Sequence, residues 1–442
     1  MRFPFHQTFP ILALSLLLVA PPAALHAAKA PKVRTLPETA AATADPRELA
    51  FPGAEGFGAH ARGGRGGATL HVTTLEDHDE PGSLRWAVAQ PGPRSVVFDV
   101  GGTLSLRKPL VIERPFLTID GSGAPVPGIT IRDAGIRIHR THDIIVRHLR
   151  IRPGDEAPLG KGAFRGRPRA GGHGDAVSVG ESVDVILDHL SASWSTDETI
   201  SVTRSRRVTV QNCFITEPLA NPALHIEEGV EIAHAYGALV NGDGVSYLRN
   251  YLACFTIRGP QLSGGTPGLP SRSAAINNLV AFYENSGTRA KASREPADFV
   301  IRNNFYRHPL NPEAPEIHLL AERTEKGTSN FIDPKDAVGR TRVFIAGNLG
   351  PRRRSADADA WTGVRSAVPA EILRELRANE PPFTVSPLTL LPAEAVEEHV
   401  LAHAGATLPR RDAIDERLVR QHRAGAGKVI FSQDDVGGYD GR

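Results

Sequence analysis

A short β-branched run that ends at a polar residue recurs through most of the chain, and it constrains the fold more than any other feature. Seven such segments align on one position, whose residues are His148, His189, Cys213, Asn250, Asn278, Asn304 and Asn348. Three residues earlier the segments carry Ile145, Ile186, Val210, Tyr247, Ala275, Ile301 and Ile345. Directly after the position come Leu149, Leu190, Phe214, Tyr251, Leu279, Phe305 and Leu349. This regularity is typical of a repeat protein.

The spacing of the aligned positions sets the size of one repeat. Successive positions are 41, 24, 37, 28, 26 and 44 residues apart, so the shortest spacings measure one coil and the longer ones contain inserted loops. A unit this short cannot close a core alone and must stack on its neighbours. Asn side chains stacked at one corner can hydrogen-bond from coil to coil. We therefore predict a solenoid of β-coils, because a β-sandwich alternates more strictly and a doubly wound fold needs amphipathic helices between strands.

The two ends of the chain differ from this repeat. Arg2, an apolar run over residues 11–20 and small residues over 23–30 predict a signal peptide at residues 1–30. Residues 31–48 read as a linker and residues 49–350 as the β-helical domain. A C-terminal extension follows over residues 351–442, with helical composition at residues 369–378, 393–402 and 411–421. We expect this extension to pack on the coils, and the mature protein to be secreted, either extracellular or periplasmic.

Composition narrows the partners. The formal net charge is only +2, which gives no global attraction to nucleic acid or membranes, so we expect neither as a partner once the signal peptide is removed. The chain is expected to be a monomer. Cys213 and Cys254 occupy different positions of the repeat and are predicted to be buried free thiols.

Three aspartates follow strand-like runs closely and are candidates for chemistry. Asp175, Asp188 and Asp197 would come from neighbouring coils, about 4.8 Å apart. Carboxylates gathered in this way repel each other unless a cation intervenes, and hard oxygen ligands favour Ca²⁺. The alternative is that each aspartate binds backbone N–H groups at a turn, and for Asp188 that structural role is the preferred interpretation.

At this point the sequence resembles the pectate lyase family over roughly residues 50–350. The segments that resemble its signature, in order, are GDAV at 174–177, LDH at 187–189, SASWSTDE at 191–198 and VTV at 208–210. RGPQLSGG at residues 258–265 is similar to the family's Arg-x-Pro segment, and residues 51–86 and 96–102 to its N-terminal part. The resemblance implies an all-β fold, a right-handed parallel β-helix, with a short, partly helical C-terminal extension.

The resemblance also implies an activity: a lyase that cleaves pectate (polygalacturonate) or a related uronate polymer by calcium-assisted β-elimination. Asp175 and Asp197 would bind calcium, with Glu198 beside them, and Arg258 would be the base that removes the C5 proton. Because guanidinium is normally protonated, an arginine base predicts an alkaline optimum. The competing interpretation of Arg258 is a structural arginine that binds a loop carbonyl.

The chain departs from the family pattern at three positions. Ser201 stands where the family often has another acidic ligand, Tyr236 where a substrate-binding lysine is common, and Ser263 where a second arginine is usual. These departures predict a weaker calcium site and a less highly charged substrate. The residues predicted to bind the acidic polysaccharide are His234, Tyr236 and, from the cationic loop at residues 161–169, Arg165 and Arg167.

Two other functions stay open. A hydrolase on the same fold would need a pair of carboxyl groups, one acting as general acid and the other activating a water molecule. No tight pair of this kind is evident in the repeat region. A non-catalytic polysaccharide-binding protein could have kept the groove without the chemistry, as Ser201, Tyr236 and Ser263 allow. The combination of Arg258 with Asp175 and Asp197 favours the lyase.

Overall fold

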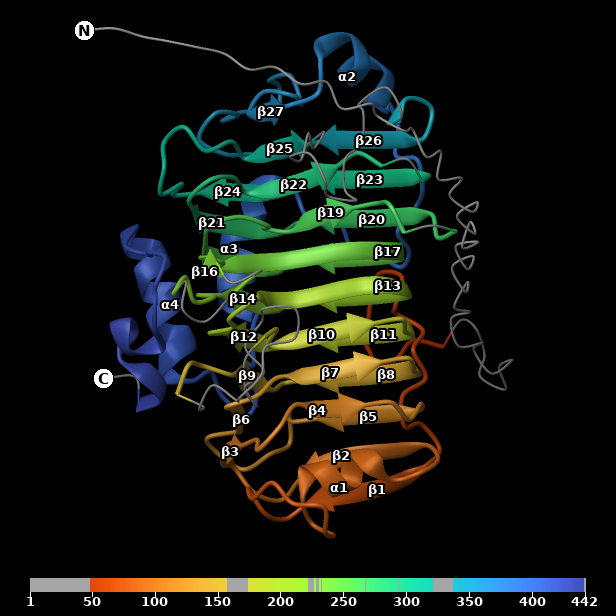
Figure 1. Ribbon diagram of the computed structural model, residues 1–442, viewed down its shortest axis with the longest axis vertical. Helices are drawn as coiled ribbons and strands as arrows, with labels where there is room; N and C mark the ends of the chain where they lie inside the picture. Colours follow the sequence, from red (N-terminus) through yellow and green to blue (C-terminus); the bar gives the residue numbers. More distant parts are fainter. Residues whose placement is uncertain are drawn as a thin grey trace, which may run out of the picture. The chain divides into compact units, whose positions relative to one another are not determined.

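The strands stack as parallel coils, and the coils between the two ends contribute strands to three sides of the molecule (Figure 1). The computed structural model describes residues 48–156, 174–221, 226–227, 230–231, 233–266, 268–293, 295–320 and 337–440, all of which belong to the compact unit formed by residues 36–442. Among these residues no helix is both long enough and apolar enough to cross a membrane.

The first side, here called the groove side, consists of strands that pair in parallel from coil to coil. They are β4 (Leu110–Ile112), β7 (Ile136–His139), β10 (Val177–Gly180), β13 (Glu198–Gln211), β17 (Tyr236–Leu248), β19 (Gln261–Ser263), β22 (Thr288–Lys291), β25 (Ile317–Leu320) and β27 (Val364–Ser366). Along each strand the apolar side chains alternate inward, as Ile136 and Ile138 do on either side of exposed Arg137.

The second side continues the same 17-stranded sheet. Strands β13 and β17 are long enough to belong to both sides, and register shifts at Thr203–Ser205 and Asp243–Val245 mark the corner. The other strands of this side are β1 (Ala68–Val72), β2 (Arg94–Phe98), β5 (Leu117–Asp120), β8 (His142–Arg147), β11 (Val183–Asp188), β20 (Ser271–Ile276), β23 (Ala297–Arg302) and β26 (Thr341–Ala346).

The third side, here called the covered side, is a separate eight-stranded parallel sheet. Its strands are β3 (Gly102–Ser105), β6 (Ile129–Arg132), β9 (Arg150–Arg152), β12 (Ser191–Ser193), β14 (Phe214–Thr216), β18 (Tyr251–Phe255), β21 (Leu279–Tyr283) and β24 (Phe305–Arg307). A two-stranded antiparallel ribbon, β15 (Ile226–Glu227) with β16 (Val230–Glu231), lies outside the coils' sheets. The three sides enclose one apolar core that runs through the coils, so the chain is a right-handed parallel β-helix, as predicted.

A ladder of asparagines runs along the corner between the second and the covered side, as the repeat predicted. The side-chain oxygen of each Asn accepts from the backbone N–H of the residue one coil earlier, at 2.9–3.0 Å, from Cys213 through Asn250, Asn278 and Asn304 to Asn348. Buried polar groups at this corner thus find partners in the neighbouring coil, and the stacking is specific.

The predicted alignment of His148 and His189 with this ladder was wrong by one residue. Asp188 pairs with Gln211, so Leu190, not His189, lies beside Cys213, and its N–H contacts Cys213 Sγ at a separation of 23 residues. A one-residue slip exchanges inside and outside in a strand. Accordingly Val146 and Leu187 are in the central core, whereas Ile145 and Ile186 lie outside it.

In seven coils, the residue directly before the ladder residue is a turn residue with a left-handed backbone conformation. Its φ angles lie between 50° and 66° at His148, His189, Asn212, Arg249, Asn277, Asn303 and Gly347. Asn and Gly tolerate this conformation best, which explains why they dominate the later coils.

Asp188 is held by neighbouring side chains and not by the backbone N–H groups that were expected to bind it. It is fully buried, and its carboxylate accepts from Arg147 Nε at 2.9 Å and Gln211 Nε2 at 2.8 Å. Although burial opposes ionisation, His189, Arg147 and Gln211 hold the pKa of Asp188 well below its usual range. Cys213 and Cys254 are free and buried, as expected, and burial raises the pKa of both thiols.

Helices lie at both ends of the chain. Helix α1 (Leu84–Ala89) is near the first coil (Figure 1). Helices α2 (Ala370–Leu376), α3 (Val396–His403) and α4 (Ala413–Ala424) overlap the three segments predicted to be helical, and α3 and α4 end one and three residues beyond them. Short 3₁₀ turns at Ala393–Ala395, Gln433–Val436 and Gly438–Asp440 complete the tail. The apolar faces of α3 and α4 pack against the covered side through Val396, Val400, Leu401, Ile414 and Leu418.

Candidate active site

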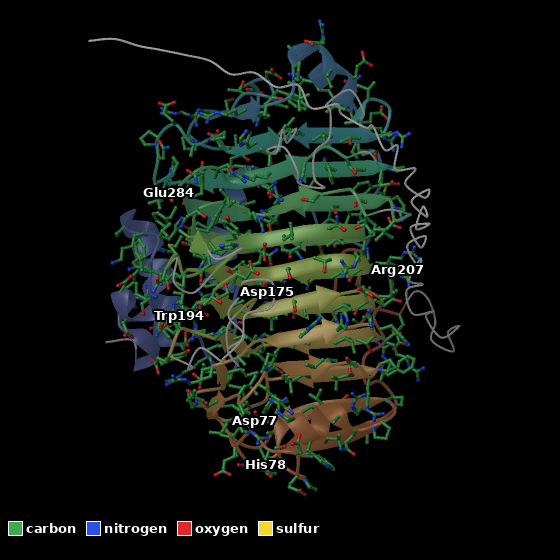
Figure 2. The ribbon with its side chains drawn as sticks, viewed as in Figure 1. Asp77, His78, Asp175, Trp194, Arg207 and Glu284 are labelled. Atoms are coloured by element: carbon green, nitrogen blue, oxygen red, sulfur yellow. The ribbon has the colours of Figure 1, made fainter. Side chains whose placement is uncertain are left out.

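Most of the residues predicted to be functional meet in a groove on the groove side. The groove has a volume of about 620 Å³ and is lined by Asp175, Asp197, Glu198, His234, Tyr236 and Arg258, among others. Asp175 lies in the middle of this face, well away from the C-terminal helices (Figure 2). Each residue sits at or just before the start of β10, β13, β17 or β19. Because parallel strands begin at the same edge, four successive coils bring these side chains together.

The three carboxylates predicted to bind metal form a cluster. One oxygen from each of Asp175, Asp197 and Glu198 lies within 4.8 Å of the others. Asp175 accepts from the backbone N–H of Glu198 at 3.2 Å and from the hydroxyl of Ser201. Both donors belong to the next coil, 23 and 26 residues further along the chain, so these bonds orient Asp175 across coils and are not a local turn cap. Clustered carboxylate oxygens are the donors that Ca²⁺ prefers, so these residues fit such an ion.

Arg258 lies directly beside this cluster. Its guanidinium forms an ion pair with the carboxylate of Glu198, and its Cζ lies 4.3 Å from the centroid of the Tyr236 ring. The Arg258 backbone has φ +72°, a conformation that costs energy for a residue other than glycine and is common where a side chain is aimed at a site. Its side chain is 23% exposed, so it remains accessible from the groove.

His234 and Tyr236 complete the wall of the groove. His234 is buried, and its Nε2 lies 3.6 Å from Oδ1 of Asp197. Its ring contacts that of Tyr236, with centroids 4.2 Å apart. Tyr236 pairs in register with Glu198 of the preceding coil. An aromatic ring therefore occupies the place where a lysine was noted as common, and it packs on Arg258 instead of adding a charge.

The remaining predicted residues are placed as follows. Arg165, Arg167 and the rest of the cationic loop lie outside the described residues. Ser201 stands in the groove at the position where the family often has another acidic ligand. Its hydroxyl donates a hydrogen bond to Asp175 and so orients that carboxylate. Ser263 is buried in β19 and accepts from the side chain of Gln261.

Two groove arginines, Arg137 and Arg204, were missed in the sequence. Arg137 is exposed on β7, and it makes no hydrogen bond or ion pair with any residue that the structure describes. It is in register with Ser178, which in turn pairs with Ser201. Burial, followed by the charges of Arg137 and Arg140, lowers the pKa of His139 beside it. No motif marks Arg137, and its place in this row follows from its register with Ser178.

The second groove arginine, Arg204, forms an ion pair with Glu181 at 2.8 Å.

Comparisons with known proteins identify the class. No family model matches the chain. The chain is 39% identical over 399 residues to a probable pectate lyase C of Aspergillus flavus, covering 88% of this chain and 81% of the relative. It is also 39% identical over 398 residues to a probable pectate lyase C of Emericella nidulans, covering 88% of this chain and 80% of that protein.

A solved structure agrees in fold. Jun a 1, the major allergen from cedar pollen, superposes with a TM-score of 0.52 at 16% identity, covering 80% of this chain and 92% of that one. With relatives this similar over most of their length, the chain belongs to the pectate lyase family. It is a pectate lyase-like enzyme.

Proposed function

We propose that the groove cleaves pectate, or a related uronate polymer, by calcium-assisted β-elimination, with Arg258 as the base. The observation that carries this proposal is the meeting of Arg258 with Asp175, Asp197 and Glu198 in one groove. Two relatives with 39% identity are named pectate lyases, which supports the same substrate class.

The reaction needs a base at C5 and a sink for negative charge. The neutral form of Arg258 takes the C5 proton, the electron pair of that bond forms the C4–C5 double bond, and the C4–O bond breaks with its electrons on the leaving oxygen. That oxygen then takes a proton from solvent. Calcium held by Asp175, Asp197 and Glu198 would withdraw charge from the C6 carboxylate and acidify the C5 proton.

The Glu198–Arg258 ion pair sets a condition on this mechanism. A carboxylate beside a guanidinium favours its protonated form, which cannot act as a base. Productive geometry therefore requires Glu198 to turn from Arg258 towards the other two carboxylates, and deprotonation of Arg258 is favoured at alkaline pH. We expect an alkaline optimum for the elimination.

Arg137 and Arg204 offer a reason why the groove can work without the lysine replaced by Tyr236. Both guanidinium groups line the groove, and Arg137 is exposed. Guanidinium binds carboxylates in a bidentate manner, so Arg137 is suited to bind a uronate carboxylate, and Arg204 is suited to do so once it leaves Glu181. The substrate is therefore still acidic, although the positive charges are arranged differently from the family pattern.

The test is the ultraviolet absorbance of unsaturated product released from polygalacturonate at alkaline pH, with calcium and then with a chelator. We expect product in calcium and a loss of about 100-fold or more when it is removed. Reducing ends without unsaturated product would indicate a hydrolase. Binding of pectate without any product would indicate a polysaccharide-binding protein that lacks the chemistry.

We also propose that the protein is secreted. The basic, apolar and small-residue order of residues 1–30 supports this, because export machinery recognises that order. The N-terminal sequence of the mature protein, recovered outside the cytoplasm, should begin near residue 31. Recovery of the full-length chain in the cytoplasm would contradict it.

A further inference from the structure

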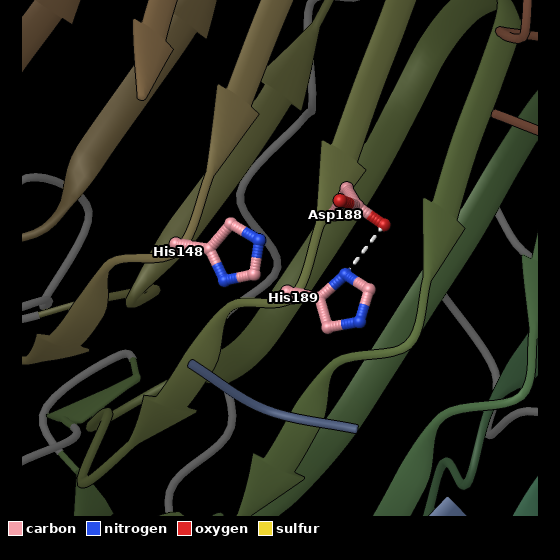
Figure 3. Close-up of side chains that lie close together, drawn as sticks. All are labelled: His148, Asp188 and His189. Atoms are coloured by element: carbon pink, nitrogen blue, oxygen red, sulfur yellow. Dashed lines mark ion pairs between the residues drawn. The ribbon is translucent and has the colours of Figure 1, made fainter. Parts of the chain in front are cut away.

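Two histidines and an aspartate gather at the corner between the second and covered sides, away from the groove. His148 and His189 follow β8 and β11 in adjacent coils, and Asp188 is the last residue of β11 (Figure 3). The two imidazole rings stack with centroids 4.8 Å apart. One donor atom from each of the three side chains lies within 4.8 Å of the others.

One nitrogen of each ring, Nδ1, has no hydrogen-bond partner among the residues that the structure describes. His148 is only 4% exposed, and its Nδ1 bonds to none of the described residues. Nδ1 of His189 lies 2.8 Å from Oδ1 of Asp188 but is not aligned for a hydrogen bond, so it too is unsatisfied. Leaving a buried polar atom unpaired is unfavourable. Two such atoms beside one carboxylate indicate that a further group binds between them.

The surroundings suit a bound cation. Arg147 and Gln211 fix the Asp188 carboxylate, as outer partners commonly fix metal-binding carboxylates. The stacked rings of His148 and His189 bring nitrogen donors from two adjacent coils to the same carboxylate. A pocket of about 330 Å³ lined in part by His189 offers a path from solvent.

We infer that His148, Asp188 and His189 form a second metal site, for one divalent transition-metal ion. Two imidazoles and a carboxylate are the donors that Zn²⁺ and its neighbours prefer, whereas Ca²⁺ prefers the all-oxygen cluster in the groove. The ion would join two adjacent coils through the turns that follow β8 and β11. The site is independent of the proposed elimination.

The experiment uses the full chain without a tag, freed of metal by a chelator and titrated calorimetrically with Zn²⁺. His148→Asn and His189→Asn are the informative variants. Asparagine already occupies the same left-handed turn position in later coils, at Asn212, Asn277 and Asn303, so the backbone should tolerate it. We expect one Zn²⁺ per chain, and loss of saturable binding in both variants.

Two controls locate the ion. His403→Asn removes a histidine at the opening of the same pocket, and Asp175→Asn alters the groove carboxylates; both should keep the Zn²⁺ site. Zinc binding that survives in His148→Asn and His189→Asn, or that is lost with His403 instead, would overturn the assignment. Co²⁺ added to the unmutated protein gives a check that needs no variant. Intense visible bands indicate Co²⁺ held in a four-coordinate protein site, and only the weak spectrum of hydrated Co²⁺ would contradict the site.

Discussion

The groove side and the covered side come from the same coils, yet the outer face of one is open while the outer face of the other is covered by helices. On the covered side Phe214 and Tyr251 point outward and are buried beneath α3 and α4. On the groove side Arg137 and its neighbours in register remain open. Figure 2 shows the same contrast, with Trp194 beside the helices and Asp175 on the open face. The repeat forms both faces, and the C-terminal extension covers one of them, which leaves the groove side accessible to a substrate.

The charges on the two sides differ in the same way. Arg152 of the covered side is fully buried and contacts Asp415 at 2.8 Å and Asp412. Its partners lie at the start of α4, so the ion pairs attach the tail to the coils. In the groove, by contrast, Arg258 and Asp197 are partly exposed and can exchange protein partners for ligands. Buried pairs hold the structure together, while accessible ones are available for chemistry.

Arg152→Ala should have the largest effect on stability. It leaves Asp415 buried without its cation, and breaking a buried pair from one side costs about 3–5 kcal/mol. Chemical denaturation should report this loss in the free energy of unfolding, with product formation per folded molecule nearly unchanged. A loss under 1 kcal/mol would show that the tail does not depend on this contact.

Arg137→Ala should have an intermediate effect, confined to the groove. Losing one exposed charge–charge contact with substrate is worth about 1 kcal/mol, which is roughly a fivefold rise in KM. Initial rates at several pectate concentrations check this, with Arg137→Lys as a variant that keeps the charge. An unchanged KM in the alanine variant would remove Arg137 from the binding surface.

Arg342→Ala should have the smallest effect. Its side chain is 56% exposed and pairs with Asp298 on the second side, outside the groove and away from the Arg152 ion pairs. Exposed pairs contribute about 0–1 kcal/mol, so neither the unfolding midpoint nor KM should change appreciably. It is thus the matched arginine control for both preceding variants. A large effect would mean that the charges of the second side are coupled to one of the others.

Much of the fold could be predicted because the repeat is local. Each coil carries its own apolar positions and corner residue, so the Asn ladder from Asn250 to Asn348 was readable from one sequence. The His148 and His189 positions were misaligned because the left-handed turn residue and the ladder residue are adjacent and both polar in later coils. Only strand register distinguishes them.

The candidate site was predictable where a motif carries it and not where stacking alone creates it. Asp175, Asp197, Glu198 and Arg258 fall in recognisable segments. Arg137 sits in a strand without a motif, and its place in the groove follows from pairing with Ser178, which is 41 residues later in the sequence. Contacts between distant coils depend on loop lengths, which the residue pattern does not encode.

The central claim is that the groove side performs the elimination through Arg258. The most direct measurement is the rate of unsaturated product formation by Arg258→Ala, compared with Arg272→Ala, whose arginine pairs with Asp243 at the corner of the second side. Loss of a general base lowers the rate by about 10²–10⁴-fold, so we expect that loss in the first variant and a near-normal rate in the second. A folded Arg258→Ala protein that retains its rate within about twofold would contradict the account.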